Sequence, residues 1–166
     1  SAAVGTVGSS LVTAAGGNGA TSGVQIAGTP GRWFTAPADP PDGDLGGMPQ
    51  DRALGAIGDS AIVDIAGFGA MAMSYAPAQQ EGLGGFMPDD GLDLPGLLLR
   101  RVHPGFGDLG FRTGLCACDI VTSDRSPVIS LGILDVQGKA GRLGGGIYRI
   151  PLEPFAAAVE QTATGG

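Results

Sequence analysis

The sequence predicts an α+β fold with a mostly antiparallel or mixed sheet, one central glycine-rich helix and a C-terminal helix. Three observations favour this class. Short β-branched runs and helix-periodic stretches alternate without a regular βαβ rhythm. Glycine and proline supply 32 and 12 of the 166 residues, yet 43% of residues are hydrophobic and they are interspersed with glycine. The length suits one domain with a real core, so we expect a single domain over residues 1–166.

The sequence of the N-terminal part predicts a β-hairpin. Residues 9–15 and 23–28 are short β-branched runs separated by a glycine-rich loop. Asn18 with Gly19 is typical of a tight turn, and the alternative is that Asn18 binds a substrate. Residues 33–35 should continue the sheet. Residues 36–54 are rich in proline and aspartate, so they should form an irregular surface loop.

The central element is expected from Ile57 to Tyr75. After the turn Gly58-Asp59-Ser60, apolar residues recur at three- and four-residue spacing, which indicates a helix with one buried face. Asp59 or Ser60 would cap this helix, because either side chain can accept a hydrogen bond from the first-turn N–H groups.

The next segment, residues 77–96, is rich in proline, glycine and acidic residues. We expect an excursion without regular structure there, which is a candidate for a flexible lid. Residues 97–102 and 115–122 stay ambiguous between a strand and a short helix.

Two strands and a helix are expected towards the C-terminus. Residues 127–134 have the β-branched content and flanking turns of a buried strand. Residues 147–150 should form the last strand. Pro151 should open the C-terminal helix as its first residue.

The charge excludes several partners. The net charge is −7 and nine residues are Lys or Arg, so we expect no binding to nucleic acid or to an acidic membrane. No apolar run approaches ~20 residues and the first residues lack a signal-peptide pattern, which predicts a cytoplasmic protein. Cys116 and Cys118 are too close for an ordinary disulfide, and a single His does not complete a zinc site with them. We expect reduced, half-buried thiols, and neither a metal nor a cofactor.

The turn Gly58-Asp59-Ser60 also has a functional interpretation. Gly58 would let a small anionic ligand approach the backbone at the positive end of a helix, and Asp59 and Ser60 are then the catalytic candidates. A G-D-S block also occurs at the nucleophile of one group of serine hydrolases. Their general-base His needs an Asp three residues earlier, where this chain has Arg100 before His103, so we set that interpretation aside.

The scarce basic residues beside glycine turns are candidates for anion binding. Arg32 can hold a carboxylate or phosphate with two hydrogen bonds, its plane fixed by stacking on Trp33; the alternative is a surface Arg packed over an aromatic ring. Residues 135–146 interleave glycines with Lys139 and Arg142, as an anion-binding loop would. This segment lacks the G-K-[ST] ending of a P-loop.

The ordered motifs resemble the YlbE-like family. Between residues 9 and 160 the shared blocks are S-S-L-V-T-A, G-V-Q-I-A-G, R-W-F-T-A-P-A, G-D-S-A-I, P-V-I-S-L-G-I and G-R-L-G-G-G-I-Y-R-I-P-L-E-P-F. That family includes a subunit associated with oxamate carbamoyltransferase. Its members carry a long N-terminal region, so the resemblance implies that this chain corresponds to the C-terminal half. The family has a His-Lys pair after the P-V-I block, where this chain has Asp135-Val136 with Lys139 displaced.

The resemblance implies a subunit of a carbamoyl- or amide-group transferase or hydrolase acting on a small anionic nitrogen compound. Arg32 would hold the substrate carboxylate, and Asn18, Lys139 and Arg142 are further binding candidates. The amides of residues 58–60 would polarise an acyl or phosphoryl oxygen, while Asp59 would orient or deprotonate an amine.

The alternative is a non-catalytic subunit whose apolar, glycine-rich surface completes a homo- or hetero-oligomer. A chain carrying the missing N-terminal half is a candidate partner.

Overall fold

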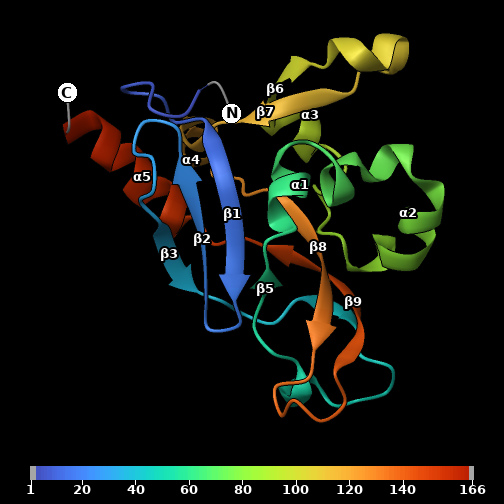
Figure 1. Ribbon diagram of the computed structural model, residues 1–166. Coiled ribbons are helices and arrows are strands. Elements are labelled where there is room, and N and C mark those ends of the chain that lie inside the picture. Colours follow the sequence, from blue (N-terminus) through green and yellow to red (C-terminus); the bar gives the residue numbers. More distant parts are fainter. Residues whose placement is uncertain (1–2, 165–166) are drawn as a thin grey trace.

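The computed structural model describes residues 3–164 and has the predicted α+β architecture (Figure 1). Strands pair antiparallel in three sheets, of order β3-β2-β1-β5, β4-β9-β8 and β6-β7. The strands are β1 (Val12–Asn18), β2 (Thr21–Ile26), β3 (Phe34–Pro37), β4 (Asp42–Asp44), β5 (Ile57–Gly58), β6 (Leu99–Val102), β7 (Arg112–Leu115), β8 (Val128–Leu134) and β9 (Arg142–Arg149).

Short helices connect these strands and one longer helix ends the described chain. The α-helices are α1 (Ala61–Ile65), α2 (Pro77–Leu83), α3 (Leu94–Leu98), α4 (Ala117–Ser123) and α5 (Glu153–Thr164). The 3₁₀-helices are η1 (Gln50–Arg52), η2 (Gly69–Tyr75), η3 (Gly84–Phe86) and η4 (Pro104–Leu109). Within residues 3–164, no helix is long and apolar enough to cross a membrane.

The N-terminal hairpin is confirmed, with a tighter turn than the predicted loop. β1 continues to Asn18 and β2 begins at Thr21. The Asn18 carboxamide oxygen accepts hydrogen bonds from the amides of Ala20 and Thr21 at 3.0 and 2.8 Å, and Gly19 has φ +87°. An Asn followed by a glycine with positive φ stabilises such a turn locally.

The helix predicted to run on from the turn at residues 58–60 to Tyr75 is not continuous, so this prediction is wrong. α1 ends at Ile65 and the chain resumes as η2 at Gly69. Gly67 and Gly69 have φ of +107° and +50°, which no α-helix accommodates. The helical spacing of apolar residues persists across this break because both segments bury one face.

The predicted helix cap is also wrong. Ser60 occupies the N-cap position of α1 with helical φ and ψ, and no side-chain hydrogen bond caps this helix. Instead, Asp64 within α1 fixes the break that follows. Its buried carboxylate oxygen Oδ1 accepts from the amide of Ala70 at 2.6 Å and from the amide and hydroxyl of Ser130 at 2.9 and 3.0 Å.

The segment from residue 77 to residue 96 has regular structure, contrary to the prediction. Pro77 and Pro95 lie in the first turns of α2 and α3, where a missing N–H breaks no helical hydrogen bond. Leu94 and Leu98 are fully buried and anchor α3 in the core. Proline here starts helices, whereas the sequence interpretation took it as a sign of irregular chain.

The predicted surface loop over residues 36–54 is only partly irregular. β3 extends to Pro37, and β4 pairs with β9, where Gly43 lies opposite Gly146. A Cβ on Gly43 would lie 2.3 Å from the carbonyl oxygen of Gly145, so glycine is required for this pairing.

The remaining elements include two mixed segments. Residues 97–102 join the end of α3 to β6, and residues 115–122 join the end of β7 to α4, so each contains both kinds of structure. The strand predicted at 127–134 is confirmed as β8. The last strand begins earlier than predicted, at Arg142, and α5 starts at Glu153 and not at Pro151.

One main hydrophobic core holds the sheets and helices together. Phe155 of α5 is fully buried, and α5 packs against β2, β3 and α4 on one side of the four-stranded sheet (Figure 1). α1 packs between β1 and β8 and so joins the four-stranded and three-stranded sheets. The short strand β5 and the start of α1 therefore lie at the seam between these sheets.

Candidate functional site

An open pocket of about 710 Å³ lies where the glycine-rich end of β1 meets β5. Four segments form it, and its lining consists of Ala15, Gly16, Gly17, Asn18, Thr21, Ser22, Gly23, Trp33, Thr35, Ile57, Gly58 and Asp59. The structure thus brings together three of the predicted site residues, Asn18, Gly58 and Asp59, from segments 40 residues apart in the sequence. We refer to this pocket as the glycine pocket.

The floor of the glycine pocket is backbone, because side chains do not fit there. A Cβ on Gly17 would lie 2.3 Å from the carbonyl oxygen of Ala56, and one on Gly23 would lie 2.5 Å from that of Phe34. Gly58 has φ +121°, a conformation that residues with a Cβ avoid. Strands β1, β2, β3 and β5 therefore pack closely here, and a ligand in the pocket would contact the main chain.

A buried hydroxyl pair lies beneath this floor. Ser22 Oγ and Tyr148 OH are 2.8 Å apart, and both residues are buried. Burial raises the pKa of the Tyr148 phenol, so the pair is neutral over the ordinary pH range. Both residues also line a cavity of about 10 Å³, roughly the space of one water molecule. The sequence does not indicate this pair, because Ser22 lies in the predicted hairpin loop and Tyr148 in the predicted last strand, 126 positions apart.

Polar groups of different kinds rim the glycine pocket. Among the described residues that line it, Asp59 is the only charged one, and its side chain is exposed. The carboxamide oxygen of Asn18 is engaged in the hairpin turn, which leaves its NH₂ group as a donor. Trp33, the single Trp of the chain, is 48% exposed. The pocket therefore offers a carboxylate acceptor, an amide donor and an aromatic wall.

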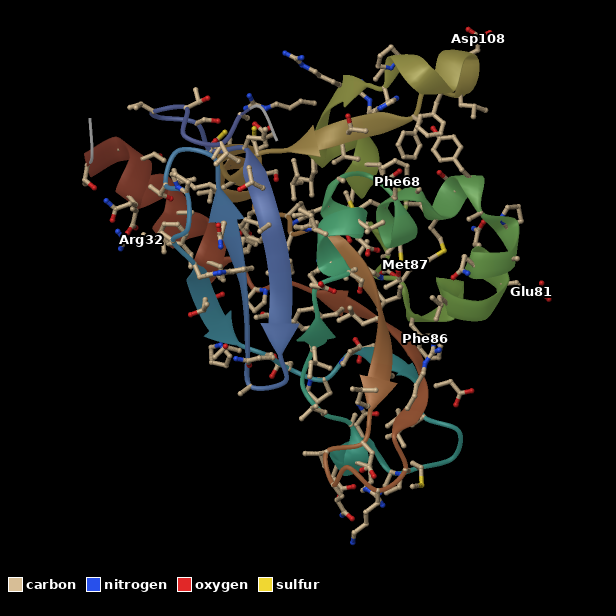
Figure 2. The ribbon with its side chains drawn as sticks, viewed as in Figure 1. Arg32, Phe68, Glu81, Phe86, Met87 and Asp108 are labelled. Atoms are coloured by element: carbon tan, nitrogen blue, oxygen red, sulfur yellow. The ribbon has the colours of Figure 1, made fainter. Side chains whose placement is uncertain are left out.

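Arg32 does not line the glycine pocket. Its guanidinium carbon lies 5.2 Å from the centroid of the Phe34 ring, so the predicted stacking on Trp33 is wrong. Alternate residues of an extended segment face opposite sides, which places Arg32 and Phe34 on one face and Trp33 with the pocket on the other. Figure 2 labels Arg32 near α5, which packs against β3.

The loop after β8 folds around the carboxylate of its own residue Asp135. The Asp135 carboxylate accepts from the amides of Gln137, Lys139 and Ala140 at 3.0, 3.0 and 2.7 Å. Arg52 donates to both of its oxygens at 2.9 and 2.7 Å and holds the pKa of Asp135 well below its usual range. The amides expected to bind an external anion are thus engaged with Asp135.

The other predicted residues lie outside the glycine pocket. Ser60 follows Asp59 in the sequence but does not line the glycine pocket. Lys139 is exposed on the loop that surrounds the Asp135 carboxylate. Arg142 is exposed at the start of β9, where its Nε donates to the carbonyl oxygen of Gly144 at 3.0 Å.

Comparisons with known proteins point to one group of relatives. The family model described as oxamate carbamoyltransferase subunit AllG matches residues 1–60. The curated AllG protein of Escherichia coli (strain K12) is 33% identical over 163 positions, covering 93% of this chain and 39% of that protein. The uncharacterized protein YahG of the same organism is 34% identical over 162 positions, covering 91% of this chain and 34% of YahG.

A solved structure is also similar to this chain. A conserved protein of unknown function from Enterococcus faecalis V583 superposes with a TM-score of 0.82 at 25% identity. The superposition covers 96% of this chain and 40% of that one. The chain thus spans about two fifths of the length of these relatives.

Proposed function

We propose that this chain is a subunit of a carbamoyl- or amide-group transferase acting on a small anionic nitrogen compound, and that the glycine pocket binds the group transferred. The observation that carries the proposal is the gathering of Asn18, Gly58 and Asp59 around one backbone-floored pocket. The similarity to AllG, described as an oxamate carbamoyltransferase subunit, supports the reaction class.

The chemistry of the rim suits a carbamoyl group. Such a group presents N–H donors and a carbonyl acceptor in one plane. The Asp59 carboxylate would accept from the nitrogen, and the Asn18 NH₂ group would donate to the oxygen. The Trp33 ring would cover the planar group and exclude water from one side.

The reaction step assigns a proton to Asp59. The attacking nitrogen of the acceptor forms a bond to the carbamoyl carbon, the bond from that carbon to the leaving oxygen breaks, and the leaving group departs as an oxyanion with the electron pair of that bond. The nitrogen loses one proton, which Asp59 accepts or directs to solvent. Amides of the turn at residues 58–60 would polarise the carbonyl oxygen as negative charge develops on it.

The glycine pocket lacks a cation for an anionic substrate. Asp59 repels a carboxylate, and no Lys or Arg is among the described residues that line the pocket. Arg32 would have to leave the Phe34 ring to reach it. We infer that a second polypeptide or another part of the assembly supplies the cation, which explains why such a chain works as a subunit.

The position of this chain in its longer relatives belongs to the same proposal. The resemblance to YlbE-like proteins suggests that this chain corresponds to their C-terminal part, and it spans about two fifths of the length of AllG and of the Enterococcus faecalis protein.

The single Trp33 gives a direct test of ligand binding. Titration with oxamide, an uncharged carbamoyl compound, should change the Trp33 fluorescence in a saturable way. Asp59→Asn should weaken this binding roughly tenfold or more, because a hydrogen bond to a charged group is lost. Oxamate should bind the isolated chain more weakly than oxamide. Arg142→Gln, outside the pocket, should bind oxamide as the unmodified chain does.

Activity of the assembled enzyme tests the role of Asp59. Asp59→Asn should lower carbamoyl transfer by ~10²-fold or more with an unchanged melting temperature. Full transfer activity in this variant, or oxamide binding that is insensitive to Asp59, would contradict the proposed site.

A second candidate function is that of a non-catalytic subunit, and an aromatic surface favours it. Ring centroids of Phe68 and Phe106 lie 4.9 and 4.6 Å from that of Phe111, and that of Tyr75 lies 5.8 Å away. Phe68, Phe106 and Tyr75 are 37%, 38% and 47% exposed. Figure 2 shows Phe68 below the β6–β7 hairpin, with Asp108 at the hairpin tip. Exposed aromatic residues are enriched at protein interfaces.

Size-exclusion chromatography with light scattering separates the two functions. If the chain is only structural, Phe106→Ser should weaken assembly with its partner, while Asp59→Asn should leave both assembly and transfer activity intact. An isolated chain that is monomeric, folded and active would exclude the purely structural role.

A further inference from the structure

We propose that Cys116, Cys118 and Asp119 form a binding site for one thiophilic divalent cation such as Zn²⁺. The two Sγ atoms and one carboxylate oxygen all lie within 4.8 Å of one another. They come from the segment C-A-C-D, which follows β7 and comprises the N-cap residue Cys116 and the first three residues of α4. This site is separate from the glycine pocket, so the proposal does not depend on the function assigned there.

The backbone around this site is fixed before any cation binds. Leu11 forms an antiparallel bridge with Cys116, and the amide of Ala117 donates to the carbonyl oxygen of Ser10 at 2.8 Å. The Ser10 hydroxyl also contacts Cys118 Sγ at 3.1 Å. The start of the chain thus holds both thiols in place, and a cation would find its ligands preformed.

One of the two thiols is buried and the other is partly exposed, an arrangement that suits a cation site. Cys116 is 6% exposed, whereas Cys118 and Asp119 are partly exposed. Both cysteines are free. A cation could therefore enter from solvent on the side of Cys118 and Asp119 and reach the buried Cys116.

The ligand types select the kind of cation. Two sulfur donors and one carboxylate match the preferences of Zn²⁺, whereas Mg²⁺ and Ca²⁺ require oxygen donors. The three groups fill three positions of a tetrahedron, and water or a partner group would fill the fourth. Binding would release the protons of both thiols and form two metal–sulfur bonds. Asp119 is not evident as a third ligand from the sequence, where the pattern of Cys and His residues alone indicates no metal site.

Arg100 balances the charge of this cluster. Its Nε and Nη2 lie 2.5 and 2.8 Å from the Asp119 carboxylate oxygens, and Nη2 lies 3.2 Å from Cys118 Sγ. The Arg100 side chain is 52% exposed, so it can turn towards solvent when a cation replaces it. The guanidinium and the cation compete for the same two groups, and this competition lowers the affinity for the cation.

A metal titration of the reduced chain tests the site. The metal-free protein is titrated with Cd²⁺ while the thiolate-to-metal charge-transfer absorption is recorded, and Zn²⁺ is then added as a competitor. We expect one Cd²⁺ per chain, displaced by Zn²⁺. Cys118→Ser should abolish the absorption, and Asp119→Asn should weaken binding by about tenfold or more.

Two further variants make the test specific. Asp108→Asn removes an exposed carboxylate outside the cluster, so it should bind like the unmodified chain. Arg100→Gln should bind up to about fivefold more tightly, since the competing ion pair is exposed and therefore weak.

Three results would overturn the proposal. These are absence of the absorption at stoichiometric Cd²⁺, unchanged affinity in both Cys118→Ser and Asp119→Asn, and weaker binding in Arg100→Gln. Circular dichroism of each variant establishes that it is folded. If Cys118→Ser fails to fold, Asp119→Asn alone decides the outcome.

Discussion

At the residue scale, two aspartates five positions apart have opposite roles. Asp59 is exposed and caps no helix, whereas Asp64 is 2% exposed and accepts three hydrogen bonds from Ala70 and Ser130. A Cβ on Gly69 would lie 2.2 Å from the Asp64 carboxylate, so this carboxylate also requires glycine at position 69. Asp59, the candidate for function, thus contributes little to the fold, whereas Asp64 fixes the local structure.

This contrast predicts different costs of substitution. Asp64→Ala should lower the free energy of unfolding by about 2 kcal/mol or more, because the buried amide of Ala70 and the partly buried amide of Ser130 lose their acceptor. Asp59→Ala should change it by less than about 0.5 kcal/mol, as at other exposed positions without a cap. Urea denaturation of both variants measures these values. A loss of more than about 1 kcal/mol in Asp59→Ala would indicate a capping role after all.

At the element scale, the pairing of β1 with β5 depends on glycine. Gly17 lies opposite Gly58, and a side chain at Gly17 would collide with the main chain at Ala56. Gly17→Ala should therefore cost about 1–3 kcal/mol, the range for overpacking. Gly82→Ala is the matched control, since Gly82 lies in α2 with open space around it, and it should stabilise by about 0.5–1 kcal/mol. Thermal unfolding compares the two variants, and equal melting temperatures would contradict this view of the β1–β5 pairing.

Local signals in the sequence predicted some elements and not others. The hairpin turn at Asn18 and the strand β8 follow from turn residues and β-branched content, which act over a few positions. The break after α1 depends on Asp64 reaching Ser130, 66 positions away. Helical periodicity indicates which face of a helix is buried, and it carries no information about such a distant hydrogen-bond donor.

The candidate site divides in the same way. Asn18, Gly58 and Asp59 were predicted because each belongs to a turn with a recognisable motif. The pairing of Ser22 with Tyr148 spans 126 positions and leaves no local pattern. Arg32 was placed beside Trp33 because the two are adjacent, yet the alternation of a strand turns adjacent side chains to opposite faces.

At the scale of the whole molecule, acid stability depends on Asp135. Its pKa is lowered in the folded chain, chiefly by Arg52 and by loop amides. A lowered pKa contributes stability above the unfolded value of about 3.9, and this contribution is lost as the pH falls through the folded pKa. Asp135→Asn should therefore be less stable than the unmodified chain near neutral pH, and the difference should shrink below about pH 4.

Asp64 acts in the opposite direction on the pH dependence. Burial raises the pKa of Asp64 in the folded chain. Its contribution to the free energy of unfolding is therefore complete below the pKa of the unfolded chain, and it is lost as the pH rises through the pKa of the folded chain. Asp64→Asn serves as the control in melting experiments across the acid range. A difference between Asp135→Asn and the unmodified chain that grows towards low pH would contradict the assignment to Asp135.

The backbone floor of the glycine pocket also limits how this protein can evolve. A substitution at Gly17 or Gly23 would place a side chain against a carbonyl group, so the shape of the floor cannot be adjusted in small steps. Changes of ligand preference would have to arise at the rim, where the side chains of Trp33 and Thr35 are exposed and alternate with the buried residues Phe34 and Ala36. Homologues with different ligands should therefore differ at the rim positions and share the glycines beneath them.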